Sequence, residues 1–252
     1  GRVPLASRER YSQLHQEALS VTFPTIDAFE QSTGYAVKSS WLNNLALHTQ
    51  VVIKKSDLNW QHGRMLYCAL RERLESFHTS EPQGTQANIF ETGTARGFSA
   101  VCMARAIIDS KQPGTVFTMD ILPHNTPMMW NCIDDHDGPK SRQELLKPWA
   151  EEISRVAFLQ GWTGRSVTSV GLSRIHFAFL DAQHTYAEVM AEYDYVRNRQ
   201  KLGDVIVFDD VSVATYDGVV KAVDAIEREG LYTVTRLVAS DKRGYAVAER
   251  ST

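Results

Sequence analysis

Three carboxylates and one histidine follow two apolar segments in the last third of the chain. Asp181 and His184 stand three residues apart, and Asp209 and Asp210 end the second segment. Carboxylates gathered in a partly dry cleft repel one another unless a positive charge lies among them. A hard divalent ion such as Mg²⁺ takes oxygen ligands of this kind. The pattern predicts a metal site at Asp181, Asp209 and Asp210. The alternative is that Asp181 and Asp209 cap helices and that His184 is an ordinary polar residue.

His184 adds acid–base chemistry to this group of acids. The unperturbed pKa of histidine, roughly 6.5, suits proton removal near neutral pH. Because His184 lies in the first turn after Asp181, we predict that it acts as a general base beside the metal.

A glycine-containing turn, Glu-Thr-Gly-Thr-Ala-Arg-Gly, follows an earlier apolar segment at residues 91–97. Gly93 and Gly97 allow a ligand to approach the backbone, and the helix that follows offers N–H donors. A dinucleotide-binding turn has another glycine where this chain has Glu91. A carboxylate pointing into the pocket would repel a pyrophosphate and attract an ammonium group. The alternative is an ordinary glycine turn with a buried glutamate.

Two further positions favour a nucleoside ligand. Asp120 ends the next apolar segment, where an acid can bind the two hydroxyls of a ribose; strand-end aspartates also cap helices. Together with Glu91, it suggests S-adenosylmethionine, a nucleoside with a positively charged amino-acid tail, rather than NAD. Gly161 and Trp162 follow a third segment, where the indole could stack on adenine or simply cap the core.

The elements that position these residues alternate between strands and helices from residue 88 onward. The predicted strands are 88–91, 115–120, 156–160, 175–181 and 205–209, followed by a hairpin at 232–239 and 244–249. The predicted helices are 98–109, 141–153, 186–199 and 218–229. This alternation predicts an α/β fold, Rossmann-like and doubly wound, with a mostly parallel seven-stranded sheet and an antiparallel C-terminal hairpin. Ligands of such sheets bind beyond the carboxyl ends of the strands.

Residues 1–76 differ from the rest of the chain and predict a helical N-terminal extension or lid. The extension ends in an amphipathic helix at 58–76, with Leu66, Leu70 and Leu74 four residues apart. The stretch 48–55 is predicted either to cover the cofactor or to contact another subunit.

Composition excludes several classes of protein. The chain has 252 residues, 27 Lys and Arg against 30 Asp and Glu, and a net charge of −3, so it lacks the basic excess of a nucleic-acid binder. No apolar stretch is long enough to span a bilayer, and we expect no membrane partner. Three cysteines without C-x-x-C spacing fit a reducing compartment, and we expect a cytoplasmic protein.

Four motifs together resemble class I S-adenosylmethionine-dependent methyltransferases. They are E-T-G-T-A-R-G, the acid Asp120, F-L-D-A-Q-H-T-Y at 179–186 and G-D-V-I-V-F-D-D at 203–210. Within that group the chain is most similar to metal-dependent sugar O-methyltransferases of antibiotic biosynthesis, such as the macrocin, mycinamicin and novobiocin-pathway enzymes, with cephalosporin-hydroxylase-like proteins as relatives. The resemblance covers residues 88–249, and its most specific part is D-x-x-H-x-Y combined with D-D.

The resemblance implies a role for each matched residue. Residues 77–252 would form the S-adenosylmethionine-binding methyltransferase domain, and Asp181, Asp209 and Asp210 would be the ligands of Mg²⁺ or another divalent cation. The expected cofactor-binding residues are Glu91, Gly93, Thr94, Gly97, Asp120, Gly161 and Trp162. Several sugar methyltransferases have a second aspartate, the proposed base, where this chain has Gln183. Since an amide cannot accept that proton, His184 takes the role of base, with Asp181 beside it.

These observations predict an S-adenosylmethionine-dependent, Mg²⁺-assisted O-methyltransferase. Its expected partner is a small-molecule hydroxyl acceptor, a deoxysugar of a secondary metabolite or a nucleotide sugar, and the chain is expected to form a homo-oligomer. Two alternatives stay open: a hydroxylase or dehydrogenase on a related sheet, and a non-catalytic protein that only binds S-adenosylmethionine.

Overall fold

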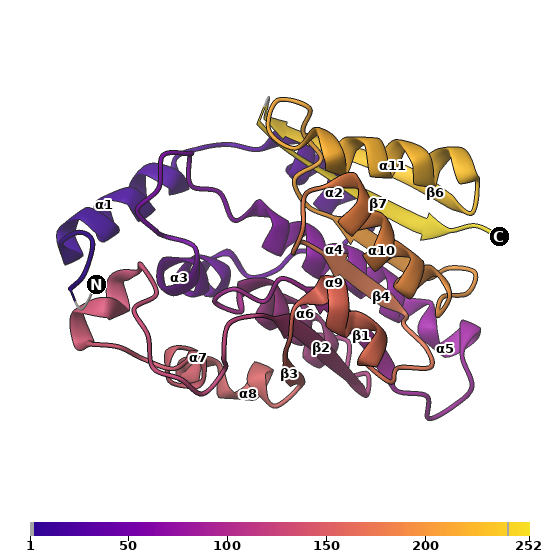
Figure 1. Cartoon of the computed structure of the whole chain (residues 1–252), viewed down its shortest axis with the longest axis horizontal. Helices are drawn as coiled ribbons and strands as arrows, with labels where there is room; N and C mark the ends of the chain where they lie inside the picture. Colours follow the sequence, from indigo (N-terminus) through magenta and orange to yellow (C-terminus); the bar gives the residue numbers. More distant parts are fainter. Residues whose placement is uncertain (1–2, 241) are drawn as a thin grey trace.

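The computed structural model describes residues 3–240 and 242–252, and a seven-stranded sheet runs through this part of the chain (Figure 1). The strand order is β3-β2-β1-β4-β5-β7-β6; β1 to β5 are parallel, and β7 pairs antiparallel with both β5 and β6. The strands are β1 (Ala87–Thr92), β2 (Gly114–Asp120), β3 (Val156–Gln160), β4 (Phe177–Leu180), β5 (Val205–Phe208), β6 (Tyr232–Ser240) and β7 (Arg243–Arg250). The predicted fold class is therefore confirmed.

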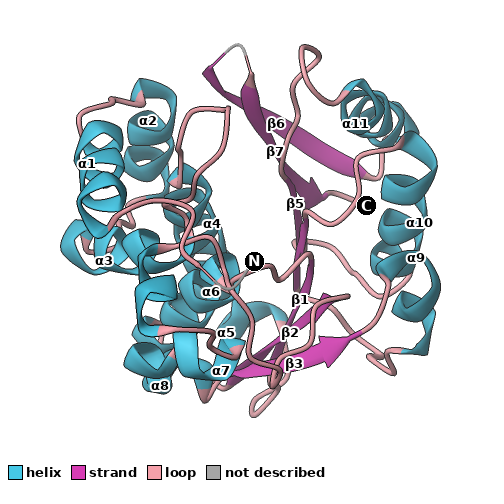
Figure 2. Cartoon of the chain, turned by 60° about the vertical axis from the view of Figure 1, so that its left-hand side comes forward, coloured by secondary structure: helices cyan, strands magenta, loops and turns pink. Residues whose placement is uncertain are grey.

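Helices cover both faces of the sheet, as Figure 2 shows. One face carries α4 (Gln61–Glu75) and α6 (Phe98–Asp109), and the other carries α10 (Tyr186–Arg197) and α11 (Asp217–Glu229). The central strands are apolar on both sides for this reason. In β1, Ile89 belongs to the core under α4 and α6, while its neighbour Phe90 belongs to the core under α10 and α11.

The N-terminal helices are α1 (Arg8–Leu19), α2 (Pro24–Thr33), α3 (Ser39–Thr49) and α4, followed by the short α5 (Phe77–Ser80). Leu66 and Leu70 of α4 are fully buried in one hydrophobic core with Ile107 of α6. The N-terminal helices are thus packed onto the rest of the fold, and the division of the chain at residue 76 stays a prediction. Within the described residues, every helix is too short or too polar to cross a membrane.

The segment between β2 and β3 differs in detail from the sequence prediction. One helix was expected over 141–153, and the structure has α7 (Arg142–Leu145), the 3₁₀ turn η2 (Lys147–Trp149) and α8 (Ala150–Ile153), after an earlier 3₁₀ turn, η1 (Ile133–Asp137). Pro148 lies at the break. It has no N–H to donate and it disfavours helical geometry in the residue before it, so one continuous helix does not form. Two more short turns, α9 (Thr163–Ser166) and η3 (Val167–Ser169), follow β3.

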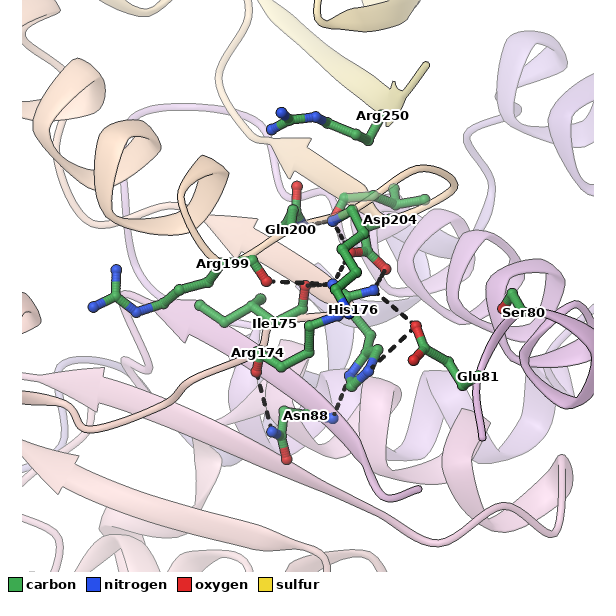
Figure 3. A network of polar contacts seen from close by, with 12 residues as sticks. Ser80, Glu81, Asn88, Arg174, Ile175, His176, Arg199, Gln200, Asp204 and Arg250 are labelled. Atoms are coloured by element: carbon green, nitrogen blue, oxygen red, sulfur yellow. Dashed lines mark hydrogen bonds and ion pairs between the residues drawn. The ribbon is translucent and has the colours of Figure 1, made fainter. Parts of the chain in front are cut away.

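A buried ionic network closes the edge of the sheet where the parallel strands begin (Figure 3). Asp204, with a fully buried side chain, accepts hydrogen bonds from Arg73 of α4 and from Arg174. Arg174 also pairs with Glu81 at 2.7 Å. Two arginines therefore neutralise two carboxylates, and this network joins α4 to the sheet.

Candidate functional site

A cavity of about 250 Å³ opens at the carboxyl ends of the parallel strands. It lies where strand order reverses, because β1 is flanked by β2 on one side and β4 on the other. The residues that line it come from the ends of β1 to β4 and the turns that follow; they are Gly93, Ala95, Met119, Asp120, Ile121, Gly161, Trp162, Thr163, Asp181, Ala182 and Gln183. Five predicted site residues, Gly93, Asp120, Gly161, Trp162 and Asp181, are thus brought together.

The turn after β1 requires its glycines. Gly93 has φ +90°, and a Cβ there would lie 2.3 Å from the backbone oxygen of Asp181. Gly97 also has φ +90°, and a Cβ there would lie 2.7 Å from Leu146. Only glycine adopts this backbone without strain and leaves the space. Gly93 therefore lets the turn after β1 approach the backbone that follows β4, and Gly97 leaves room for the side chain of Leu146.

Glu91 lies elsewhere than the sequence suggested. Its side chain is fully buried on the α6 face of β1, accepts hydrogen bonds from Ser99 and Thr118, and is not part of the cavity lining. Burial raises its pKa to about 7, against the opposing effect of the two hydroxyls. Thr94 is also buried, with its hydroxyl 2.5 Å from that of Thr118. Glu91 and Thr94 thus lie outside the cavity lining, and their hydrogen bonds stabilise the turn. A direct contact of either residue with a cofactor stays a prediction.

Asp120 does face the cavity, and its carboxylate ties two loops together. One oxygen accepts a hydrogen bond from the backbone N–H of Ala95 at 2.6 Å, and the other accepts from Leu122 at 2.8 Å. The first bond fixes the glycine turn relative to β2. The acid is thus held at the rim, within reach of a ligand in the cavity.

Trp162 is exposed over 44% of its surface at the other rim of the cavity. The guanidinium of Arg165 lies 4.9 Å from the centre of its ring. An indole that only capped the core would be buried, so its exposure favours the alternative in which it offers a flat face to a ligand.

Next to the cavity, Asp181, His184 and Asp210 each place one potential ligand atom within 4.8 Å of the others. Nε2 of His184 lies 3.0 Å from Oδ2 of Asp210, and the ring of Tyr216 stacks on the imidazole at 4.1 Å. The hydrogen bond to Asp210 raises the pKa of His184, against the effect of its burial. The predicted base is therefore oriented by an acid on one side and an aromatic ring on the other.

Asp209 makes different contacts from the other two aspartates. Arg243 of β7 donates Nη1 to Asp210 at 2.9 Å and to both oxygens of Asp209 at 3.4 Å. The backbone N–H of Asp210 also donates to Asp209, at 2.7 Å. The sequence reasoning missed Arg243 entirely. Part of the positive charge expected among the acids is an arginine of this chain, and the metal role of Asp209 stays a prediction.

The acid cluster consists of Asp181, Asp209 and Asp210. Even with Arg243 beside it, burial and mutual repulsion disfavour the ionisation of all three carboxyl groups at once. Burial raises the pKa of Asp181 well above its usual range, and repulsion by Asp209 and Asp210 adds to this effect. Burial likewise raises the pKa of Asp209 to about 6, although Arg243 opposes the shift. The cluster would therefore gain free energy from a further positive charge.

Comparison with known proteins agrees with this geometry. Residues 90–211, just under half of the chain, match a family model described as a methyltransferase domain. Over this segment the chain is similar to methyltransferase domains. The matched segment contains the turn after β1, Asp120 and Trp162. It also contains the acid–histidine group, which consists of Asp181, His184, Asp209 and Asp210. No curated protein sequence matches the chain.

Several solved structures share the fold. An O-methyltransferase from Bacillus cereus in complex with SAH is 17% identical, with 95% of this chain and 96% of that chain covered and a TM-score of 0.57. The O-methyltransferase TomG from Streptomyces achromogenes, involved in tomaymycin synthesis and bound to SAM, is 17% identical over 86% and 92%, with a TM-score of 0.58. Cofactor-bound Rv0187 from MTB is 18% identical over 92% and 100%, with a TM-score of 0.61. At these identities the likeness concerns the fold.

Proposed function

We propose that the protein is an S-adenosylmethionine-dependent O-methyltransferase. The observation that carries the proposal is the cavity at the switch point of the sheet, with Asp120 at one rim, Trp162 at the other and the acid–histidine group beside it. Asp120 would bind the ribose, Trp162 would stack on the adenine, and Gly93 would let the methionine part approach the backbone. The SAH and SAM complexes of the Bacillus and Streptomyces proteins support this choice of cofactor.

The donor set also suits a divalent cation. Asp181 and Asp210 offer carboxylate oxygens and His184 an imidazole nitrogen within a 4.8 Å group, and the buried acids are destabilised without added positive charge. We propose that Asp181 and Asp210 hold Mg²⁺ or a similar ion, with Asp209 as a further candidate. When bound, such an ion would lower the pKa of a neighbouring acceptor hydroxyl.

His184 would then remove the proton of that hydroxyl. With Nε2–H directed at Asp210, Nδ1 is the nitrogen free to accept the proton. The acceptor oxygen would attack the methyl carbon of the sulfonium, the carbon–sulfur bond would break with its electron pair left on sulfur, and a methyl ether and S-adenosylhomocysteine would form. This is a single displacement, so the chain contributes mainly positioning and charge.

For the acceptor we propose a small molecule with neighbouring hydroxyls, a deoxysugar of a secondary metabolite or a nucleotide sugar. A homo-oligomer and a cytoplasmic location belong to the same proposal, on the sequence arguments given above. A nicotinamide-dependent dehydrogenase, a hydroxylase and a non-catalytic binding protein are the competing functions.

Titration calorimetry with S-adenosylhomocysteine and with NAD separates these functions. We expect binding of S-adenosylhomocysteine, no binding of NAD, and weaker binding of S-adenosylhomocysteine by Asp120→Ala. Methyl transfer to a panel of vicinal diols is expected to require Mg²⁺ and to stop in chelator. Binding of NAD alone would overturn the proposal. Transfer that continues unchanged in chelator would remove its metal part.

A further inference from the structure

A second cavity, of about 240 Å³, lies beside the one proposed for the nucleoside. It is lined by residues 122–126 after β2, residues 158–160 at the end of β3, and Arg142 of α7. Residues 121 and 161, the immediate neighbours of the first two segments, line the nucleoside cavity. Within the described residues no aspartate or glutamate lines the second cavity, so its charge favours an anion over a cation.

Arg142 brings a buried positive charge to this cavity. It is 1% exposed, and it donates Nε to the carbonyl of Ala95 at 2.8 Å and Nη2 to the carbonyl of Leu122 at 3.5 Å. In the part of the chain that the structure describes, Nη1 makes no hydrogen bond and no carboxylate forms an ion pair with the guanidinium. Burial lowers the pKa of Arg142, whereas the charges of Asp120 and Glu91, beyond ion-pair distance, raise it. Since a buried charge is costly unless it is paired, an anion in the cavity would stabilise Arg142.

His124 adds an unpaired polar atom beside Arg142. Its ring stacks on that of Phe158, with the ring centres 3.8 Å apart, and the guanidinium carbon of Arg142 lies 5.8 Å from the centre of the same phenyl ring. Nδ1 of His124 is buried and has no hydrogen-bond partner among the described residues. Buried polar atoms are nearly always paired in folded proteins. Burial and the charge of Arg142 lower the pKa of His124, so its ring is neutral near pH 7 and keeps one N–H that can donate to an anion.

The ligands of the proposed function do not account for these two groups. S-adenosylmethionine has one carboxylate, in its methionine part, which the proposed function places at Gly93. The nucleoside part, placed between Asp120 and Trp162, carries no anionic group. The acceptor hydroxyl is placed at His184 after β4, whereas the second cavity lies at β2 and β3, with β1 between them. A different ligand is therefore needed to pair with Arg142.

We propose that the second cavity is a separate binding site for a small molecule with a phosphate or carboxylate group, which Arg142 and His124 would bind. A guanidinium matches the geometry of both anions. The volume of the cavity lies below the roughly 300 Å³ at which pockets for drug-sized ligands begin, so it suits a small ligand. This inference goes beyond the proposed function and does not depend on it, because neither residue takes part in methyl transfer.

Calorimetric titration of the full chain with sodium phosphate and with sodium acetate tests the proposal, at pH 7.5 and at an ionic strength kept constant with sodium chloride. We expect at least one of the two anions to bind, and comparing them shows whether phosphate or carboxylate is preferred. His124→Phe keeps an aromatic ring on Phe158 but lacks the donor, and is expected to weaken binding about tenfold. Arg142→Met is expected to abolish binding, and thermal unfolding checks that this variant folds. If it does not fold, His124→Phe decides.

Arg155→Met is the matched control, because Arg155 is exposed just before the other end of β3. It is expected to bind the anion as the wild type does. An equal loss in Arg155→Met and His124→Phe would reflect general surface charge and would overturn the inference. So would the absence of binding of either anion, or the same affinity in the wild type and His124→Phe.

A further titration in saturating S-adenosylhomocysteine separates the two cavities. We expect the anion still to bind, because the nucleoside lies in the neighbouring cavity. Loss of anion binding would show that the nucleoside occupies the second cavity, which would overturn a separate site. If S-adenosylhomocysteine does not bind, the proposed function fails, and the titrations without it still decide whether Arg142 and His124 bind an anion.

Discussion

The two edges of the parallel sheet handle buried charge in opposite ways. Where the strands begin, Asp204 and Glu81 are matched by Arg174, which Figure 3 shows beside them, and by Arg73. Where the strands end, Arg243 is the one arginine within the described residues that pairs with Asp209 and Asp210, and no ion pair joins it to Asp181. The pKa of Asp181 and that of Asp209 are raised there.

This difference separates a structural network from a binding site. Where the strands begin, each buried carboxylate already pairs with an arginine, so no ligand is needed to neutralise its charge. Unbalanced acids beside a cavity carry a free-energy cost that a cation can relieve, which is a property of functional sites. The residue types are the same at both edges, so only their partners distinguish them.

The largest expected effect is the loss of stability when the ionic network around Asp204 is disrupted. Asp204→Asn leaves Arg73 and Arg174 buried with one carboxylate between them, and we expect it to lower the free energy of unfolding by about 3–5 kcal/mol. Asp181→Asn removes a buried, repelled acid from the other edge and is expected to leave the free energy of unfolding unchanged or to raise it. Denaturation in urea at pH 7.5 measures both. Equal losses in the two variants would contradict the distinction between the edges.

A second prediction concerns pH. Because the pKa of Glu91 is raised from 4.5 to about 7 in the folded protein, its contribution to stability is present below pH 4.5 and is lost as pH rises through 7. The loss is of order 3 kcal/mol. Glu91→Gln should therefore be more stable than the wild type at pH 8 and similar to it at pH 4.5 to 5.

At the opposite edge the pKa of His176 is lowered to about 4, so protonation there costs stability as pH falls from 6.5 towards 4. This contribution is common to the wild type and Glu91→Gln and cancels in their difference. Thermal unfolding of both proteins across this range supplies the measurement. A difference between them that does not grow with pH would show that Glu91 is ionised in the fold.

The smallest expected effect is a difference in kcat/KM between substitutions of Asp209 and of Asp210. Asp210→Asn alters the partner of His184 and is expected to reduce kcat/KM about 100-fold, whereas Asp209→Asn, whose carboxylate is bound by Arg243, should reduce it about tenfold. Initial rates at saturating Mg²⁺ provide the comparison, with S-adenosylhomocysteine affinity as the control for folding. A larger loss for Asp209→Asn would move the centre of the metal site to that residue.

Much of the scaffold could be predicted because it depends on local pattern. Apolar segments of strand length, helical periodicity and turn glycines follow from neighbouring residues, and helix 98–109 has the same bounds in the sequence prediction and in the structure. The need for glycine at 93 and 97 was also predictable, since few residues adopt positive φ.

Other features depend on contacts between distant residues. Arg243 reaches Asp209 only because β7 pairs antiparallel with β5, and Asn131 holds the backbone of Ile53 from far along the chain. The orientation of Glu91 depends on which face of β1 meets α6, which strand alternation alone does not reveal. Helix 141–153 could have been corrected from the sequence, since Pro148 interrupts it.

The most direct test of the account is a crystal structure of the protein with S-adenosylhomocysteine and Mn²⁺, with anomalous scattering used to locate the ion. The account predicts the nucleoside between Asp120 and Trp162, and a manganese peak bounded by Asp181 and Asp210. A cavity that stays empty at saturating ligand, or a nucleoside bound elsewhere with no ion near these acids, would contradict it.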